Sequence, residues 1–107
     1  MFYTYVQNNS FGTWDDTVGK IVIIEADTAG EADAIAITKG IYFDGCQEGK
    51  DCDCCGDRWA KAWEDGSSTP KTYGDEVTEG IVKDYWHKGI VGWLYYKDGY
   101  TRPLHSI

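Results

Sequence analysis

Four cysteines lie close together near the middle of the chain, and their type and spacing suggest metal chemistry. They are Cys46, Cys52, Cys54 and Cys55. Cysteine thiolates are preferred ligands of zinc, and four of them complete a tetrahedral structural site. Glycines recur through the same stretch, and glycine accepts the backbone angles that a tight loop requires. The sequence therefore predicts a cysteine-rich loop at residues 44–57 that holds a structural zinc ion.

The spacing of the cysteines leaves the set of zinc ligands open. Cys52 and Cys55 form a C-x-x-C pair, but Cys54 lies inside it, and adjacent side chains point in different directions. Three thiolates completed by His87 or His105 are therefore an alternative to four thiolates. Burial of the cysteines as small apolar side chains is the competing interpretation. A disulfide ranks below both, because we expect a reducing compartment. A reactive thiol also ranks below both, because the acidic residues of the loop disfavour a thiolate.

Catalytic motifs are missing from the sequence. It contains no nucleophile elbow, no phosphate-binding loop and no H-E-x-x-H motif. A zinc ion with an open coordination position would activate water, with Asp53 or Asp57 as the base, so a zinc-dependent hydrolytic enzyme is the alternative. We expect no enzyme. We expect instead that Arg58, Trp59 and Tyr96 contact a ligand or a partner.

The charge and hydropathy of the chain argue against several classes of partner. Eighteen acidic residues oppose ten basic ones, and the net charge of −8 disfavours binding to nucleic acid or to anionic lipid. The longest aliphatic run, at residues 21–24, is far shorter than the roughly 20 residues that cross a membrane. No basic and apolar leader follows Met1, so we expect a cytoplasmic protein.

The first half of the chain predicts two strands and a helix. Aromatic and β-branched residues at 2–6 are typical of a strand, and the aliphatic run within 19–26 predicts a strand buried on both faces. Thr28 opens a capping box and Gly40 suits the left-handed position after a helix, so a helix is predicted over residues 29–39.

The middle of the chain predicts further short elements. Residues 41–43 follow the helix at once and indicate a strand, which would complete a crossover unit. A short second helix at 57–64 would place two tryptophans on one face. Residues 73–77 favour a short edge strand, and residues 78–88 carry a partial helical stripe.

The C-terminus predicts a β-hairpin. Residues 90–97 favour a strand, and the Asp-Gly pair that follows is typical of a two-residue type I′ turn. Residues 100–107 would return antiparallel, and Pro103 would make that strand an edge. Alternation along the first strand predicts that Leu94 and Tyr96 face outward.

Together these elements predict a single α+β domain over residues 1–107. The sheet is expected to be mostly antiparallel, with four or five strands, and the helix at 29–39 would cover one face. Apolar residues make up 42% of the chain and aromatic residues 15%, which is enough to fill one core. The oligomeric state stays open.

Four segments match a recognisable pattern. They are a D-C-x-C-C-G-D-R-W box at residues 51–59 and the segments 2–10, 24–26 and 40–45. In these segments the chain resembles a family of small uncharacterised proteins encoded by tailed bacteriophages. The resemblance implies a phage origin and one compact domain, and it supplies no reaction. The family pattern covers the last three cysteines better than Cys46, which favours the three-thiolate version of the zinc site.

These observations predict a small phage-encoded accessory protein that acts by binding in the host-cell cytoplasm. We expect its partner to be a host protein or a sequestered small molecule, in host takeover or counter-defence. This expectation rests on analogy with other small phage proteins that lack catalytic motifs, and not on an identified site. An acidic mimic of nucleic acid is a further alternative, but the acids are dispersed among ten bases instead of standing in phosphate-like rows.

Overall fold

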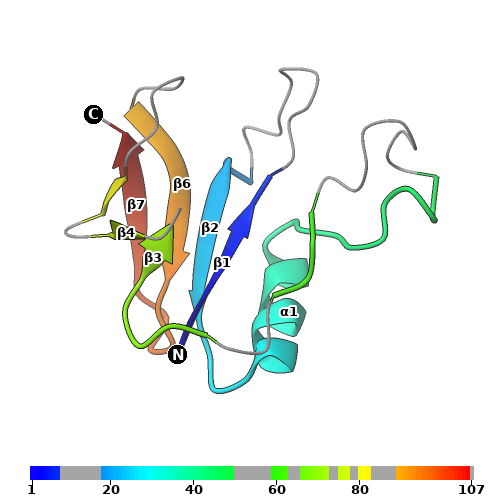
Figure 1. Cartoon of the computed structure of the whole chain (residues 1–107), viewed down its shortest axis with the longest axis horizontal. Coiled ribbons are helices and arrows are strands. Elements are labelled where there is room, and N and C mark those ends of the chain that lie inside the picture. The colour runs from blue at the N-terminus through cyan, green and yellow to red at the C-terminus, as the bar shows by residue number, and fades with distance from the viewer. Residues whose placement is uncertain are drawn as a thin grey trace.

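A five-stranded sheet organises the computed structural model, which describes residues 1–7, 18–49, 59–62, 66–72, 75–77, 80–82 and 89–106 (Figure 1). Across the sheet, the order is β1 (Phe2–Val6), β2 (Ile21–Glu25), β6 (Gly89–Tyr95), β7 (Thr101–Ser106) and β5 (Ile81–Val82). A separate two-stranded pair is formed by β3 (Lys71–Thr72) and β4 (Asp75–Glu76). The helix of the described residues is α1 (Ala29–Thr38).

The five-stranded sheet is mixed rather than purely antiparallel, so the expected mostly antiparallel sheet of four or five strands is confirmed in part. The pairs β1–β2 and β6–β7 are antiparallel, whereas β2–β6 and β5–β7 are parallel. Parallel neighbours require a crossover connection, and α1 lies on the long connection from β2 to β6. The predicted crossover unit is wrong in its second strand, because residues 41–43 form no strand and the parallel partner of β2 is β6. The Ile41 amide donates to the carbonyl of Ala36 at the end of α1, and its side chain is buried in the core instead.

Strand β2 is buried on both faces, as its aliphatic sequence predicts. Val22 and Ile24 belong to the apolar cluster on the α1 side, while Ile21 and Ile23 belong to the cluster on the opposite side. All four side chains are 0% exposed. Each contributes about 1.5–3 kcal/mol relative to an exposed position. The centre of the sheet therefore fixes the platform on which the other elements lie.

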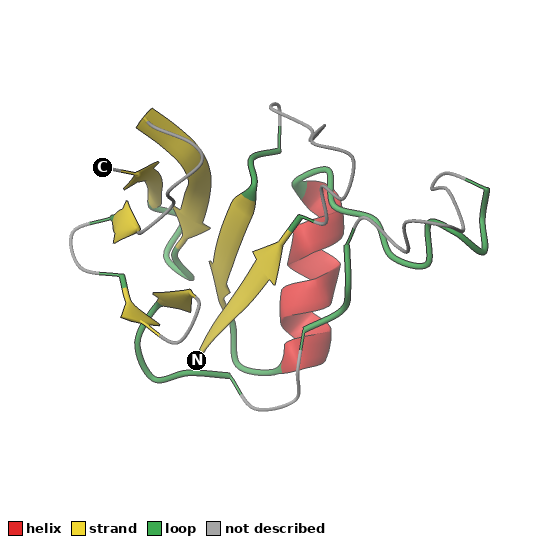
Figure 2. Cartoon of the chain, turned by 45° about the horizontal axis from the view of Figure 1, so that its top comes forward, coloured by secondary structure: helices red, strands yellow, loops and turns green. Residues whose placement is uncertain are grey.

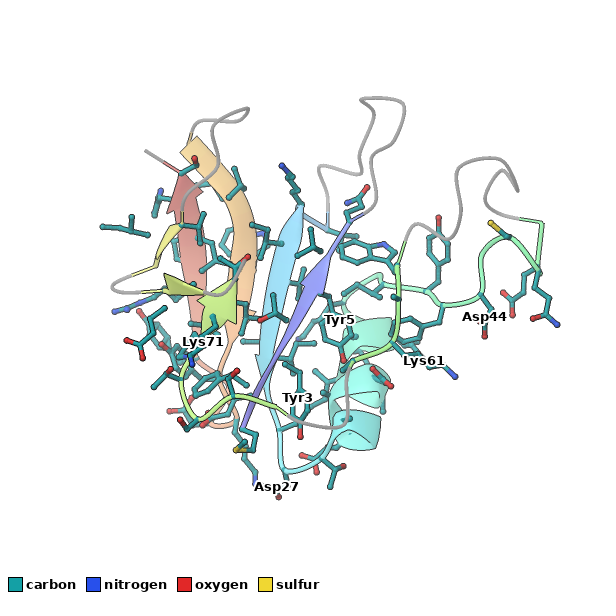
Figure 3. All side chains as sticks on the ribbon, viewed as in Figure 1. Tyr3, Tyr5, Asp27, Asp44, Lys61 and Lys71 are labelled. Carbon is teal, nitrogen blue, oxygen red and sulfur yellow. The ribbon has the colours of Figure 1, made fainter. Side chains whose placement is uncertain are left out.

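The helix α1 packs on the β1–β2 half of the sheet (Figure 2). The Thr28 side chain accepts a hydrogen bond from the Glu31 amide at 3.1 Å, and Gly40 has a φ of 99°, so both predicted caps are confirmed. The helix buries only small residues fully, Ala32 and Ala36, which lets it approach the sheet closely. Aromatic side chains of β1, including Tyr3 and Tyr5, fill the space beneath it (Figure 3). Among the described residues, no helix has the length and hydropathy needed to cross a membrane.

Two predicted helical segments do not form helices where the structure describes them. Residues 59–62 of the predicted helix 57–64 have no helical conformation, and the rest of that segment lies outside the described residues. Ile81 and Val82 form strand β5, because they pair with the end of β7 and Val82 is buried beneath the sheet. Residues 83–88 lie outside the described part. The edge strand expected at 73–77 corresponds to β4, which pairs with β3.

The C-terminal hairpin is confirmed, although its turn and its orientation differ from expectation. The Gly99 amide donates to Tyr96 and the Tyr96 amide donates to Tyr100, which encloses a three-residue loop with Gly99 at a φ of 97°. This is a turn followed by a left-handed glycine, not the two-residue type I′ turn. Leu94 is buried, not outward-facing, because a second apolar cluster covers that side of the sheet. β7 is also not the edge: β5 pairs with it at residues 105–106, beyond Pro103.

A close approach between β2 and β6 depends on Gly92. A Cβ atom at this position would lie 1.7 Å from the carbonyl oxygen of Ile21. The pairing of β6 with β7 shifts register between Ile90 and Gly92, so the glycine stands beside a bulge. The parallel contact that holds the two halves of the sheet together therefore requires glycine at this position.

Candidate functional site

The cysteine-rich loop is described only at its beginning. Cys46 is half-buried in a turn at residues 45–49, which follows Asp44 at a left-handed φ of 57°. The other three cysteines and His87 lie outside the described residues, whereas His105 is exposed on β7. Within the ranges that the structure covers, no group of three or more histidine, cysteine or acidic side chains is arranged to hold a metal ion. The zinc site stays a prediction.

The three residues predicted to contact a ligand or partner have different surroundings. Arg58 lies outside the described residues. Trp59 is 1% exposed and packs in the core beneath α1, so its side chain has a structural role there. Tyr96 lines a pocket near the hairpin loop. A functional contact at any of the three stays a prediction. Of the three, Tyr96 lines a described pocket.

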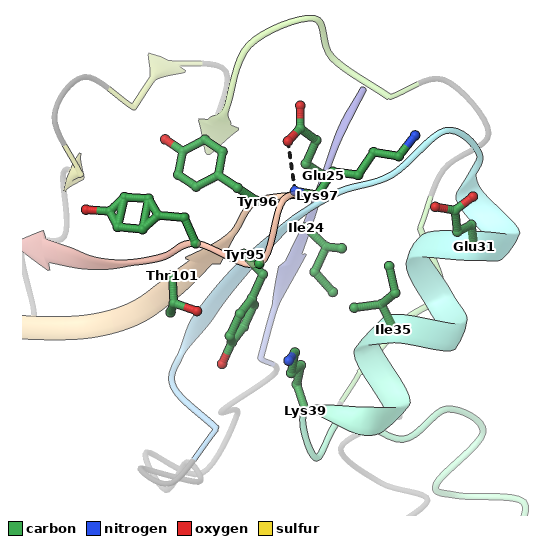
Figure 4. A pocket seen from close by; sticks show the side chains of 11 residues that line it. Ile24, Glu25, Glu31, Ile35, Lys39, Tyr95, Tyr96, Lys97 and Thr101 are labelled. Atoms are coloured by element: carbon green, nitrogen blue, oxygen red, sulfur yellow. Dashed lines mark hydrogen bonds between the residues drawn. The ribbon is translucent and has the colours of Figure 1, made fainter.

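A pocket of about 330 Å³ lies between α1 and the loop end of the β6–β7 hairpin. We call it the hairpin groove. Its lining comes from α1, β2, the hairpin loop and both hairpin strands (Figure 4). The lining residues are Ile24, Glu25, Glu31, Ile35, Lys39, Tyr95, Tyr96, Lys97, Gly99, Tyr100 and Thr101.

Regular secondary structure positions most of the groove lining. Glu31 and Ile35 on α1 and Lys39 just after its end are spaced by four residues, so they form one stripe. On the sheet, Ile24 pairs with Tyr95 and Tyr95 pairs with Thr101, so three neighbouring strands contribute one row of side chains. The helical stripe faces this row across the groove (Figure 4). Both walls are therefore held by backbone hydrogen bonds.

Tyr95 forms an aromatic wall of the groove. Burial raises the pKa of its phenol above the ordinary value, so the ring is neutral across the physiological range. The Lys39 Nζ atom lies 4.6 Å from the centre of the Tyr95 ring, at cation–π distance. The face of this ring therefore already contacts an ammonium group.

Acidic residues gather around Lys97 at the opposite end of the groove. The Lys97 Nζ atom lies 2.5 Å from Asp27 Oδ1, and the Lys97 amide donates to Glu25 Oε1 at 2.9 Å. The hydrogen bond to Asp27 raises the pKa of Lys97, and the nearby charges of Glu31 and Glu25 act in the same direction. The hydrogen bond from Lys97 lowers the pKa of Asp27. Both partners are solvent-exposed, so this ion pair contributes little to folding.

Two tyrosines stack at the outer side of the hairpin loop. The ring centroids of Tyr96 and Tyr100 lie 5.6 Å apart at an interplanar angle of 10°. Tyr96 is fixed from its other side by Phe2, whose ring meets it edge-on at 6.1 Å. Tyr100 is 54% exposed. An exposed aromatic surface therefore borders the groove, and it is anchored to the sheet through Tyr96.

A half-buried polar contact fixes the position of α1 relative to the sheet. Asp33 Oδ1 accepts hydrogen bonds from the Tyr5 hydroxyl at 2.7 Å and from the Ala62 amide at 3.0 Å. Burial raises the pKa of Tyr5, and the hydrogen bond to Asp33 adds to this effect. One carboxylate thus joins β1, α1 and the segment at residues 59–62, which keeps the helical wall of the groove in place.

Sequence reasoning assigned several groove residues to other roles. The capping box that begins at Thr28 explains Glu31 as a helix-end residue, and outward-facing Leu94 and Tyr96 would leave Tyr95 on the buried face of its strand. The spacing of the α1 stripe is visible in the sequence. Its counterpart across the groove is not, because β2 and β6 become neighbours only through a parallel pairing of residues about 70 positions apart.

Comparison with known proteins places the whole domain in one family. A family model described as "Domain of unknown function (DUF7296)" matches residues 1–105. Neither the curated proteins nor the solved structures include a match to the chain.

Proposed function

The chain belongs to the DUF7296 family, a domain whose description states no activity, and we propose that it acts by binding a partner in the hairpin groove. The observation that carries the proposal is the groove itself: an apolar floor, an aromatic wall and charged ends within one preformed pocket. Ligand sites combine an apolar lining with a few polar groups that fix orientation in this way.

The groove walls are anchored independently, which supports binding with little loss of conformational entropy. The hairpin loop is attached to β2 through the Lys97 amide and Glu25, and α1 is attached to β1 through Tyr5 and Asp33. A partner therefore has little ordering to impose on these walls.

Binding fits the side chains of the groove better than catalysis does. Both lysines of its lining already have partners, since Lys97 pairs with Asp27 and Lys39 lies over the Tyr95 ring. We therefore favour a non-enzymatic protein.

The phage resemblance supports a biological setting for this activity. We propose an accessory protein of a tailed bacteriophage that works in the cytoplasm of the host, where it binds a host protein or sequesters a small molecule. Counter-defence is one such role. The acidic charge of −8 suits a partner with a basic surface.

A structural zinc ion in the loop at residues 44–57 is a second part of the proposal. Four cysteines within the ten residues 46–55 support it, as does the tight turn around Cys46, with Asp44 and Gly49 both at positive φ. Such an ion would order the loop rather than act on a substrate.

A paired capture experiment tests binding through the groove. Thr101 is exposed and lines the groove, so Thr101→Trp should fill the groove without disturbing the core. Ile37 is 60% exposed on α1 outside the groove, so Ile37→Trp is the matched control. A partner captured from host cells by the wild type and the control, but lost with Thr101→Trp, supports the proposal. A partner retained equally by all three proteins contradicts it.

A further inference from the structure

The acidic end of the hairpin groove has more negative than positive charge. Three carboxylates, those of Glu25, Asp27 and Glu31, lie around two ammonium groups, those of Lys97 and of the N-terminus, whose charge also acts on Asp27. Asp27 pairs with the Lys97 ammonium at 2.5 Å, and the N-terminal ammonium donates to the carbonyl oxygen of Ala26 at 3.1 Å. In Figure 4, Glu31 reaches from α1 toward the side of the groove where Lys97 and Glu25 lie. One negative charge is left over, so a further cation placed between α1 and β2 would be attracted.

The Tyr95 ring supplies an independent sign that the groove accepts a cation. The ammonium of Lys39 lies 4.6 Å from the ring centre, although Lys39 is an exposed residue just after the end of α1. A flexible lysine held there shows which chemistry suits the ring face, since a cation over an aromatic ring is electrostatically favoured.

We infer that the hairpin groove binds an arginine side chain of a partner protein, which extends the proposed function by naming the recognised group. The aliphatic stem lies on the floor formed by Ile24 and Ile35. The stem passes the Tyr95 ring, and the planar guanidinium at its end forms hydrogen bonds with the carboxylate of Glu31 at the acidic end of the groove. Guanidinium suits this site better than ammonium because it is planar, weakly hydrated and able to bind carboxylates in a bidentate manner.

The size and charge of the protein fit an occupant of this kind. A volume of about 330 Å³ lies near the lower end of the roughly 300–1,000 Å³ range of ligand pockets, which suits one side chain rather than a large cofactor. The net charge of −8 would steer a basic surface toward the protein. Binding should therefore weaken as the salt concentration rises.

A peptide titration followed by amide NMR tests the inference on the intact chain. The probes are a short capped peptide with one central arginine and the same peptide with citrulline, which keeps the shape and removes the charge. The arginine peptide should shift the amide signals of Lys97, Gly99 and Glu31 and bind at least fivefold more tightly than the citrulline peptide. Equal binding of the two peptides, or shifts confined to residues outside the groove, would overturn the inference.

Two variants test whether the arginine peptide binds in the groove. One further probe, free arginine, tests whether the natural ligand is part of a protein. Glu31→Gln should lower the affinity for the arginine peptide two- to fivefold, as expected for the loss of one exposed carboxylate. Glu48→Gln, the same change in the turn at residues 45–49, should leave it unchanged. Free arginine should bind no more tightly than the capped peptide, and tighter binding would contradict a protein partner. Loss of partner capture with Thr101→Trp, together with equal peptide binding, would leave the proposed function standing and refute this inference alone.

Discussion

Lys39 and Tyr95 meet across the hairpin groove, with the lysine ammonium 4.6 Å from the centre of the tyrosine ring. The first residue lies just after α1 and the second ends β6, so the contact connects two elements that are far apart in the sequence. It joins the end of the helix to the β6–β7 half of the sheet. The same contact shows that the aromatic wall of the groove tolerates a positive charge.

Breaking this contact should weaken the fold slightly. Lys39→Gln removes the charge over the Tyr95 ring and should lower the free energy of unfolding by about 0.5–1 kcal/mol, as for exposed cation–π pairs. Urea denaturation measures the change, with Lys61→Gln as a control at an exposed lysine. In a double-mutant cycle with Tyr95→Leu, the two changes should be non-additive. Full additivity would mean that the two side chains do not interact.

Substitution of two glycines by alanine should have opposite effects on stability. Gly92→Ala places a methyl group 1.7 Å from the Ile21 carbonyl oxygen, so it should cost about 3 kcal/mol and disrupt the β2–β6 pairing. Gly30→Ala meets no atom within 4 Å in helix α1, so it should stabilise by about 0.5–1 kcal/mol. Thermal unfolding of the two variants beside the wild type gives both values. A tolerated Gly92→Ala would show that the two strands are farther apart than described.

Alkaline pH should destabilise the protein through Tyr5. Burial, with the hydrogen bond to Asp33, raises the pKa of Tyr5 in the folded state. In the unfolded chain a tyrosine ionises near pH 10. The unfolded state therefore loses a proton more readily, and the stability from Tyr5 is complete below about pH 10 and decreases as the pH rises beyond it. Melting temperatures measured from pH 8 to 11 should fall more steeply for the wild type than for Tyr5→Phe. Parallel curves would show that Tyr5 ionises equally in both states.

Zinc should bind to the cysteine-rich loop and stabilise the domain. Elemental analysis should find about one zinc per chain, and a chelator should lower the melting temperature. Cys52→Ser and Cys54→Ser should each reproduce the effect of the chelator. Cys46→Ser distinguishes the ligand sets, because zinc should survive it only in the three-thiolate version. A metal-free protein with an unchanged melting temperature would refute the zinc site.

The parts of the fold that sequence predicted correctly are those determined by local or single-strand patterns. The caps of α1 at Thr28 and Gly40 follow from hydrogen-bonding chemistry within a few residues. The full burial of β2 follows from its unbroken aliphatic run. The antiparallel hairpin follows from a strand, a glycine-containing turn and a returning strand. Each of these patterns is complete within about 20 residues.

The parts that sequence missed depend on contacts between distant segments. Ile41 ends up in the core rather than in a strand, because the strand that pairs with β2 comes from residues 89–95. Leu94 is buried by residues such as Val77 and Val82, which approach from a separate part of the chain. The hairpin groove has the same origin: its helical stripe can be read from the sequence, but the row from Ile24 through Tyr95 to Thr101 cannot.

The most direct test of the hairpin groove as a binding site is an intermolecular nuclear Overhauser measurement on the complex with the arginine peptide. Contacts are sought between the δ-protons of the arginine and the ring protons of Tyr95. Binding in the groove predicts that these contacts are present and that they are lost with Thr101→Trp. Contacts that involve only tyrosines outside the groove, at saturating peptide, would contradict the site.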